Sequence, residues 1–178
     1  MHRVLMLLAV LFVSRTLLGA WGANYDLDAL PSVPEGFKVQ FVAREPDLLH
    51  EVCICFDEKG RLFVGGGPQF RWPKPETPKD SIKILIDKDG DGKADEIKKF
   101  AEGFNCIQAM AWRGKDLWVC HCPSVTVVRD LDGDDVADEF IDVFTDLGSL
   151  RHGLHGFNWA PDGKLYMSQG NNTCTKNA

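Results

Sequence analysis

The sequence predicts an all-β protein, a β-propeller of four-stranded blades of which about three are present. Three observations lead to this fold class. A strand–turn–strand pattern recurs along the chain, an aspartate-rich loop recurs between its copies, and no segment after residue 22 has helical periodicity. Repeats of about 40–55 residues with this content are typical of propeller blades.

The recurring pattern is an apolar strand, a polar turn that contains glycine, and the triplet Leu–aromatic–aliphatic. Its copies lie at residues 53–66, 109–122 and 156–170. The leucine of the triplet is residue 62, 117 or 165, so the copies are 117 − 62 = 55 and 165 − 117 = 48 residues apart. Each copy is predicted to form a β-hairpin, because two strand-like runs flank a short turn.

A second hairpin is predicted between successive copies. "SIKILID" leads through an acidic loop to "EIKKFAEG", and "SVTVVRD" leads through a similar loop to "EFIDVFTDLG". Two hairpins per repeat give the four strands of a blade. A β-sandwich of hairpins is the alternative, but it does not explain why glycine turns alternate with acidic loops. Closed propellers have about four to eight blades, so residues 23–178 are predicted to be the N-terminal part of a longer, six-bladed ring.

Residues 1–22 are predicted to be a secretory signal peptide. Arg3 precedes an apolar run over residues 4–13, and small residues follow as far as Gly22. The run is too short for a membrane-spanning helix, which needs about 20 residues. Cleavage is expected after Gly22, with Ala20 as the alternative, and an uncleaved lipid or membrane anchor is the minor alternative. The protein is therefore expected in the periplasm, outside the cell or on its surface.

The charge of the chain argues against nucleic acid and anionic membranes as partners. The formal net charge is −6. Loss of Arg3 and Arg15 with the signal peptide leaves 18 basic and 26 acidic side chains, or 18 − 26 = −8. This balance suits a protein that binds divalent cations, whereas a merely solvated acidic surface is the alternative.

The first acidic loop, "DKDGDGKAD" at 87–95, has the spacing of a calcium site. Its predicted ligands are four carboxylates and one backbone carbonyl: Asp87, Asp89, Asp91, Asp95 and the carbonyl of Lys93. Oxygen ligands at alternate positions can surround Ca²⁺, with Gly92 at the sharp turn. Lys98 stands where an EF-hand needs glutamate, so the loop is not an EF-hand. It resembles the calcium-binding hairpin loops of integrin-type propeller blades. A solvated acidic turn is the alternative.

The second acidic loop, at 130–138, repeats the pattern with one change. Its predicted ligands are the carboxylates of Asp130, Asp132, Asp134 and Asp138. Asp135 takes the place of the glycine. If the backbone there needs a positive φ, a residue other than glycine costs about 1 kcal/mol. We therefore expect this loop to bind Ca²⁺ less tightly than the first.

The cysteines leave two interpretations open. Cys53 and Cys55 alternate along one predicted strand, and Cys120 and Cys122 along another, so each pair faces one side of a sheet. They are either small buried hydrophobic residues or partners in a cross-strand disulfide. A zinc site from "CHC" at 120–122 is a weaker alternative, because its spacing matches no common zinc motif.

The segment "GGGPQFRWPKPETPKD" at 65–80 has too many prolines for a central strand. We expect a long surface loop of the kind that carries substrate contacts. A plain linker is the alternative.

The segment "RHGLHGFNWAPDGKLYMSQGN" at 151–171 resembles part of the soluble quinoprotein sugar dehydrogenases, the PQQ-dependent glucose/sorbosone dehydrogenase superfamily. In that superfamily a histidine precedes the "PDG-x-LY" strand turn by nine residues, as His152 does here. The wider sequence, including "VPEGFKVQFVAREPDLLHEVCICFDEKGRLFV" and the two acidic loops, resembles membrane-bound dehydrogenase proteins of planctomycete-type bacteria. The resemblance covers about residues 33–171.

The resemblance implies an enzyme that oxidises a sugar or an alcohol. His152 would be the general base, while hydride passes to pyrroloquinoline quinone (PQQ). An electron-acceptor protein or a cytochrome domain would then reoxidise the quinone. The superfamily commonly has a glycine-rich step after this histidine, whereas the present sequence has His155 there. In the superfamily, the cationic residues that hold the quinone come from later blades. The alternative for His152 is a loop histidine without a catalytic role. The protein would then be a non-catalytic, calcium-stabilised propeller that binds proteins or glycans.

Overall fold

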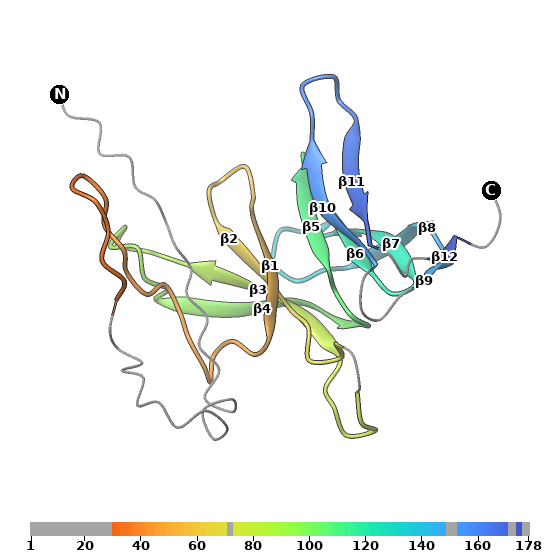
Figure 1. Ribbon diagram of the computed structural model, residues 1–178, viewed down its shortest axis with the longest axis horizontal. Coiled ribbons are helices and arrows are strands. Elements are labelled where there is room, and N and C mark those ends of the chain that lie inside the picture. Colours follow the sequence, from red (N-terminus) through yellow and green to blue (C-terminus); the bar gives the residue numbers. More distant parts are fainter. Residues whose placement is uncertain (1–29, 71–72, 149–152, 171–173, 176–178) are drawn as a thin grey trace.

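The protein is composed of antiparallel β-sheets, as the sequence predicts (Figure 1). The computed structural model describes residues 30–70, 73–148, 153–170 and 174–175. The predicted signal peptide lies outside these residues. Within them, no helix is long and apolar enough to cross a membrane.

Two of the sheets have four strands in simple sequential order. Sheet A consists of β1 (Glu51–Phe56), β2 (Leu62–Gly66), β3 (Asp80–Ile86) and β4 (Glu96–Phe104). Sheet B consists of β5 (Ala109–Arg113), β6 (Asp116–His121), β7 (Ser124–Arg129) and β8 (Glu139–Phe144). A third repeat begins with the hairpin of β10 (Leu154–Trp159) and β11 (Leu165–Gln169), and β9 (Leu147–Gly148) pairs with β12 (Cys174–Thr175).

The predicted hairpins are confirmed in each repeat. The three glycine-turn patterns form the hairpins β1–β2, β5–β6 and β10–β11, and the acidic loops join β3 to β4 and β7 to β8. Both acidic loops therefore occupy the same place in their sheets. The turn glycines Gly60 and Gly163 have φ values of 77° and 79°, which other residues rarely adopt.

The main core lies between sheets A and B. Phe63, Ile82, Ile84 and Phe100 of sheet A meet Met110, Leu117, Val119 and Val128 of sheet B. The first strands of the repeats lie side by side, since β5 contacts β1 and also β10 (Figure 1). A smaller cluster with Ala109, Cys120 and Leu154 joins sheet B to the third repeat.

The opposite face of sheet A is partly covered by residues 38–48, which we call the N-terminal segment. Leu48 of this segment is buried with Leu62, Val64 and Leu85. Its Val42 carbonyl accepts a hydrogen bond of 3.0 Å from the backbone N–H of Ala94, in the first acidic loop.

The same bond recurs in the next repeat, where the N–H of Ala137 donates to the Phe100 carbonyl at 2.8 Å. Ala137 follows Ala94 by 43 residues and occupies the same place in the second acidic loop. Residues around Val42 therefore lie beside the first loop in the way that β4 lies beside the second.

The predicted 65–80 loop is shorter than expected. Gly65 and Gly66 belong to β2 and Asp80 begins β3, so the connection spans residues 67–79. Asp80 is fully buried and accepts hydrogen bonds from the backbone N–H groups of Gln69 at 2.8 Å and Ile107 at 2.7 Å. Gln69 is also buried. The hydrogen bond from Gln69 to Asp80 thus fixes the start of the connection to sheet A. A plain linker would lack such a contact.

The cysteines on β1 and β6 behave as small core residues. Cys53 and Cys55 face the main core, and neither they nor Cys120 form a disulfide. Burial raises the pKa of the Cys55 and Cys120 thiols to about 12. The disulfide alternative is therefore wrong for these three residues. Among the described residues, the groups that could hold a metal ion contain aspartates and no cysteine.

Candidate functional site

The first acidic loop folds around the oxygen atoms of its own aspartates. Asp87 accepts hydrogen bonds from the N–H groups of Gly90 and Gly92, both at 2.7 Å. Three further bonds turn the remaining carboxylates onto the loop backbone. These are Asp91 N–H to Asp89 at 3.1 Å, Lys93 N–H to Asp91 at 2.8 Å and Lys88 N–H to Asp95 at 2.7 Å. The spacing of the aspartates thus determines the path of the loop.

The second acidic loop repeats this pattern bond for bond. Asp130 accepts from the N–H groups of Gly133 at 2.6 Å and Asp135 at 3.0 Å. The other bonds are Asp134 N–H to Asp132 at 3.2 Å, Val136 N–H to Asp134 at 2.8 Å and Leu131 N–H to Asp138 at 2.7 Å. The two loops are therefore copies of one structure.

In each loop, three carboxylates bring one oxygen atom each to within 4.8 Å of the others. The groups are Asp87, Asp89 and Asp91 in the first loop, and Asp130, Asp132 and Asp138 in the second. Two oxygens on opposite sides of a Ca²⁺ ion are about 4.8 Å apart, because each Ca²⁺–oxygen distance is about 2.4 Å. The spacing fits ligands of one hard cation. Calcium binding by these residues, and by Lys93, Asp95 and Asp134, stays a prediction.

The electrostatics of the first loop favour ionised carboxylates. Desolvation is the largest single effect on Asp87 and opposes its charge, but the N–H groups of Gly92, Gly90 and Asp91 together outweigh it, so the pKa of Asp87 lies below its ordinary value. Asp87 is thus an anion at neutral pH, which is the form that binds a cation.

Asp135 occupies the left-handed backbone position of the second loop. Its φ is 71°, and the equivalent Gly92 has a φ of 87°. The positive φ considered for this position from the sequence is confirmed. Aspartate tolerates left-handed backbone better than most residues, although at a higher free energy than glycine.

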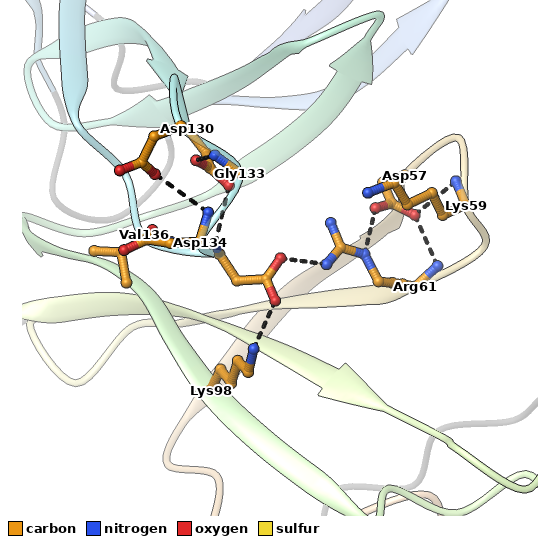
Figure 2. Close-up of polar contacts among 10 residues, drawn as sticks. Asp57, Lys59, Arg61, Lys98, Asp130, Gly133, Asp134 and Val136 are labelled. Atoms are coloured by element: carbon orange, nitrogen blue, oxygen red, sulfur yellow. Dashed lines mark hydrogen bonds and ion pairs between the residues drawn. The ribbon is translucent and has the colours of Figure 1, made fainter.

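The side chain of Asp135 joins sheet B to sheet A. Its carboxylate accepts hydrogen bonds from Arg61 at 2.5 Å and from Lys98 at 2.7 Å. Figure 2 shows the side chains of Arg61 and Lys98 extending toward the second acidic loop. Arg61 lies before β2, and Lys98 lies in β4. The Nε of the same Arg61 guanidinium donates a hydrogen bond of 2.7 Å to the Asp57 carboxylate. The aspartate that replaces the loop glycine is therefore an ion-pair partner of the preceding repeat.

The surroundings of Asp135 stabilise its charge. Lys98 and then Arg61 lower the pKa of the Asp135 carboxyl, against a smaller effect of desolvation. The same contact raises the pKa of Lys98. The three groups stay charged over the physiological pH range.

This ion-pair network was not predicted from the sequence. The signal was an acidic residue where the loop pattern needs glycine, together with Arg61 and Lys98 in the preceding repeat. No periodicity connects these positions, since 74 residues separate Arg61 from Asp135.

The candidate catalytic residue, His152, lies outside the described residues. The next residue, Gly153, donates its N–H to the side-chain oxygen of Gln108 at 3.0 Å. His155 is exposed on β10, and its Nδ1 lies 2.8 Å from the hydroxyl of Ser168. The general-base role of His152 therefore stays a prediction.

Comparisons with known proteins found one family. The model of a family described as "Domain of unknown function (DUF7133)" matches residues 27–177. No curated protein and no solved structure matches the chain.

Proposed function

The chain belongs to this DUF7133 family of unknown function, and we propose that it is the N-terminal part of an exported, calcium-stabilised β-propeller. One observation carries the proposal. An acidic loop with the same internal hydrogen bonds joins the third and fourth strands of two successive four-stranded sheets. A structural feature that recurs once per sheet is expected of a blade element. The side-by-side first strands support a propeller over a sandwich.

Calcium has a structural role in this proposal. The predicted ligand aspartates are exposed except for the partly buried Asp130, and both loops join neighbouring strands at the ends of the sheets. Three converging carboxylates repel one another until a cation neutralises them. Ca²⁺ would therefore bind the folded chain more tightly than the unfolded chain. This difference in affinity would stabilise each β-hairpin.

Thermal unfolding in Ca²⁺ and in EGTA tests this proposal. We expect Ca²⁺ to raise the melting temperature, and Asp89→Ala combined with Asp91→Ala to remove most of the increase. Glu102→Ala with Glu58→Ala is the matched control, because it removes two exposed acidic groups outside the loops. A melting temperature that is the same in EGTA and Ca²⁺ would contradict the proposal.

A dehydrogenase activity is the second part of the proposal. The spacing of His152 to "PDGKLY", nine residues to Pro161, supports oxidation of a sugar or an alcohol by PQQ with His152 as the base. Three cations of the described residues, Arg61, Lys98 and Arg129, form ion pairs with carboxylates of the chain itself, so these three are not available to hold the quinone. A non-catalytic propeller that binds proteins or glycans is the alternative, in which calcium has the same role.

Dye reduction by a complete propeller that contains these residues distinguishes the two functions. With PQQ, Ca²⁺ and a panel of sugars and alcohols, His152→Ala should lower kcat by about 10²–10⁴-fold, as expected for the loss of a general base. His155→Ala is the control for a histidine of the same segment. Unchanged turnover in the His152 variant would favour the binding protein.

A further inference from the structure

Three side chains form a hydrogen-bonded chain across sheet B, which we call the His121 chain. His121 lies in β6, Thr126 in β7 and Asp142 in β8. Thr126 stands directly opposite Asp142 in the strand register. His121 pairs with Ser124 and is therefore the diagonal neighbour of Thr126. Such residues can reach each other on one face of a sheet. The His121 chain thus runs from the second strand of sheet B to its edge strand.

The hydrogen bonds of the His121 chain have a defined direction. The Thr126 hydroxyl donates to the Asp142 carboxylate at 2.5 Å, and its oxygen also lies 2.8 Å from Nε2 of His121. A carboxylate only accepts, and a hydroxyl has one proton to donate. Because that proton goes to Asp142, Nε2 of His121 must donate in the second bond. The neutral imidazole therefore has its free lone pair on Nδ1.

The Nδ1 atom of His121 is enclosed by the protein. It is buried and has no hydrogen-bond partner among the described residues. The Phe104 ring of sheet A packs edge-on against the imidazole, with ring centroids 5.1 Å apart and planes at 71°. Thr126 is also buried, whereas Asp142 is exposed. The basic atom of the histidine is thus at the enclosed end of the His121 chain, and the carboxylate is at its exposed end.

The surroundings of His121 favour its neutral form. Burial is the largest effect and lowers the pKa of His121. The Asp142 carboxylate of β8 and the backbone of Cys122 raise this pKa, but they do not outweigh burial. The other contacts are uncharged, since β7 provides the Thr126 hydroxyl and β4 provides the Phe104 ring. His121 is therefore neutral in the folded protein at neutral pH.

We propose that the His121 chain makes sheet B sensitive to acid. A proton taken up from solvent at Nδ1 would place a positive charge and an unpaired N–H inside the protein, which is unfavourable. The folded sheet therefore excludes this proton, and opening of the sheet admits it. Because β7 and β8 also hold the second acidic loop, acid would loosen the contact of this loop with sheet A. The proposal rests on neither calcium binding nor dehydrogenase activity.

The effect of pH on stability has a defined sign. The pKa of His121 in the folded state lies below its ordinary value of 6.5. Its contribution to stability is therefore fully present above pH 6.5 and is lost as the pH falls through the folded pKa. Within that interval the unfolding equilibrium constant should rise by up to about tenfold per pH unit, which is the limit for one proton.

Nitrogen-15 NMR of the folded, full chain tests the proposal without a change in stability. The proton of neutral His121 should be on Nε2, and the titration midpoint of this histidine should lie below pH 6.5. Asp142→Asn should lower the midpoint further, because the variant removes the charge that raises it and keeps an oxygen that accepts from Thr126. A midpoint at or above pH 6.5, a proton on Nδ1 of the neutral ring, or an unchanged midpoint in the Asp142 variant would overturn the proposal.

Urea unfolding of the full chain between about pH 5 and 7, where histidine ordinarily titrates, is the second test. His121→Gln keeps an N–H donor for Thr126 but cannot take up a proton. Its stability should depend less on pH than that of the wild type, by up to one proton. Thr126→Ser is the matched control, since it keeps the hydroxyl and should show the wild-type dependence. Equal pH dependence in the wild type and the His121 variant would contradict the proposed acid sensitivity.

Discussion

Replacing Asp135 by asparagine tests whether the contact between the second acidic loop and sheet A stabilises the fold. Asparagine has the same shape and tolerates left-handed backbone, so the substitution removes the charge while the strain at φ 71° is retained. The Asp135 side chain is 17% exposed and that of Arg61 is 25% exposed. Lys98 is 38% exposed, so solvent screens its ion pair with Asp135 more strongly.

The expected loss of stability is modest and measurable. A partly buried, charge-assisted pair such as Arg61–Asp135 contributes about 1 kcal/mol to the free energy of unfolding. For a domain of this size, about 1 kcal/mol corresponds to a decrease in the melting temperature of about 2–4 °C. Asp135→Gly should be less destabilising than Asp135→Asn, because glycine also relieves the backbone strain.

A double-mutant cycle between Asp135→Asn and Arg61→Gln isolates the pair. Urea unfolding in EGTA should give a coupling energy of about 1 kcal/mol, and the cycle subtracts the loss of the Arg61–Asp57 contact. Asp132→Asn, an exposed carboxylate of the same loop, should show no coupling to Arg61. A coupling energy within about 0.3 kcal/mol of zero for Asp135 and Arg61 would refute the reasoning.

The pH dependence of the same variant has a defined sign. Lys98 and Arg61 lower the pKa of Asp135 in the folded state below its ordinary value of 3.8. The stabilisation is therefore present above pH 3.8 and is lost as the pH falls through the folded pKa. The stability difference between wild type and Asp135→Asn should disappear in that acid range.

Two further predictions concern a buried carboxylate and the calcium loops. Asp80→Ala should lower the free energy of unfolding by about 3 kcal/mol, because it leaves the buried N–H groups of Gln69 and Ile107 without an acceptor. Urea unfolding checks this, and Asp80→Asn should lose less, since its amide oxygen still accepts. If one loop binds Ca²⁺ with a Kd of about 1 µM, about 1 mM free Ca²⁺ should raise the melting temperature by about 10 °C. Calorimetry with and without EGTA measures the increase.

The hairpins could be predicted because each depends on residues that are close in the chain. Gly60 and Gly163 make the turns, and Leu62 and Leu165 begin the strands that follow. The acidic loops were recognisable for the same reason, since each predicted ligand carboxylate in them accepts a hydrogen bond from an N–H within seven residues.

Contacts between repeats could not be predicted in this way. Asp80 lies 27 residues from Ile107, and Gln40 donates to the Asp91 carbonyl across 51 residues. Neither pair belongs to a periodic pattern. The packing of the N-terminal segment on sheet A was unforeseen because its residues form no strand with a regular hydrogen-bond ladder.

The two loops have the same backbone conformation but differ in how a bound cation would affect the rest of the protein. In the second loop, Asp130 is a predicted ligand and also accepts the N–H of Asp135, whose side chain binds Arg61. A cation that fixes Asp130 would therefore also fix the group that joins sheets A and B. In the first loop, Asp87 accepts the N–H of Gly92, which has no side chain to transmit the effect. Removal of calcium should consequently loosen the contact between the sheets through the second loop, even though its site is predicted to be the weaker one.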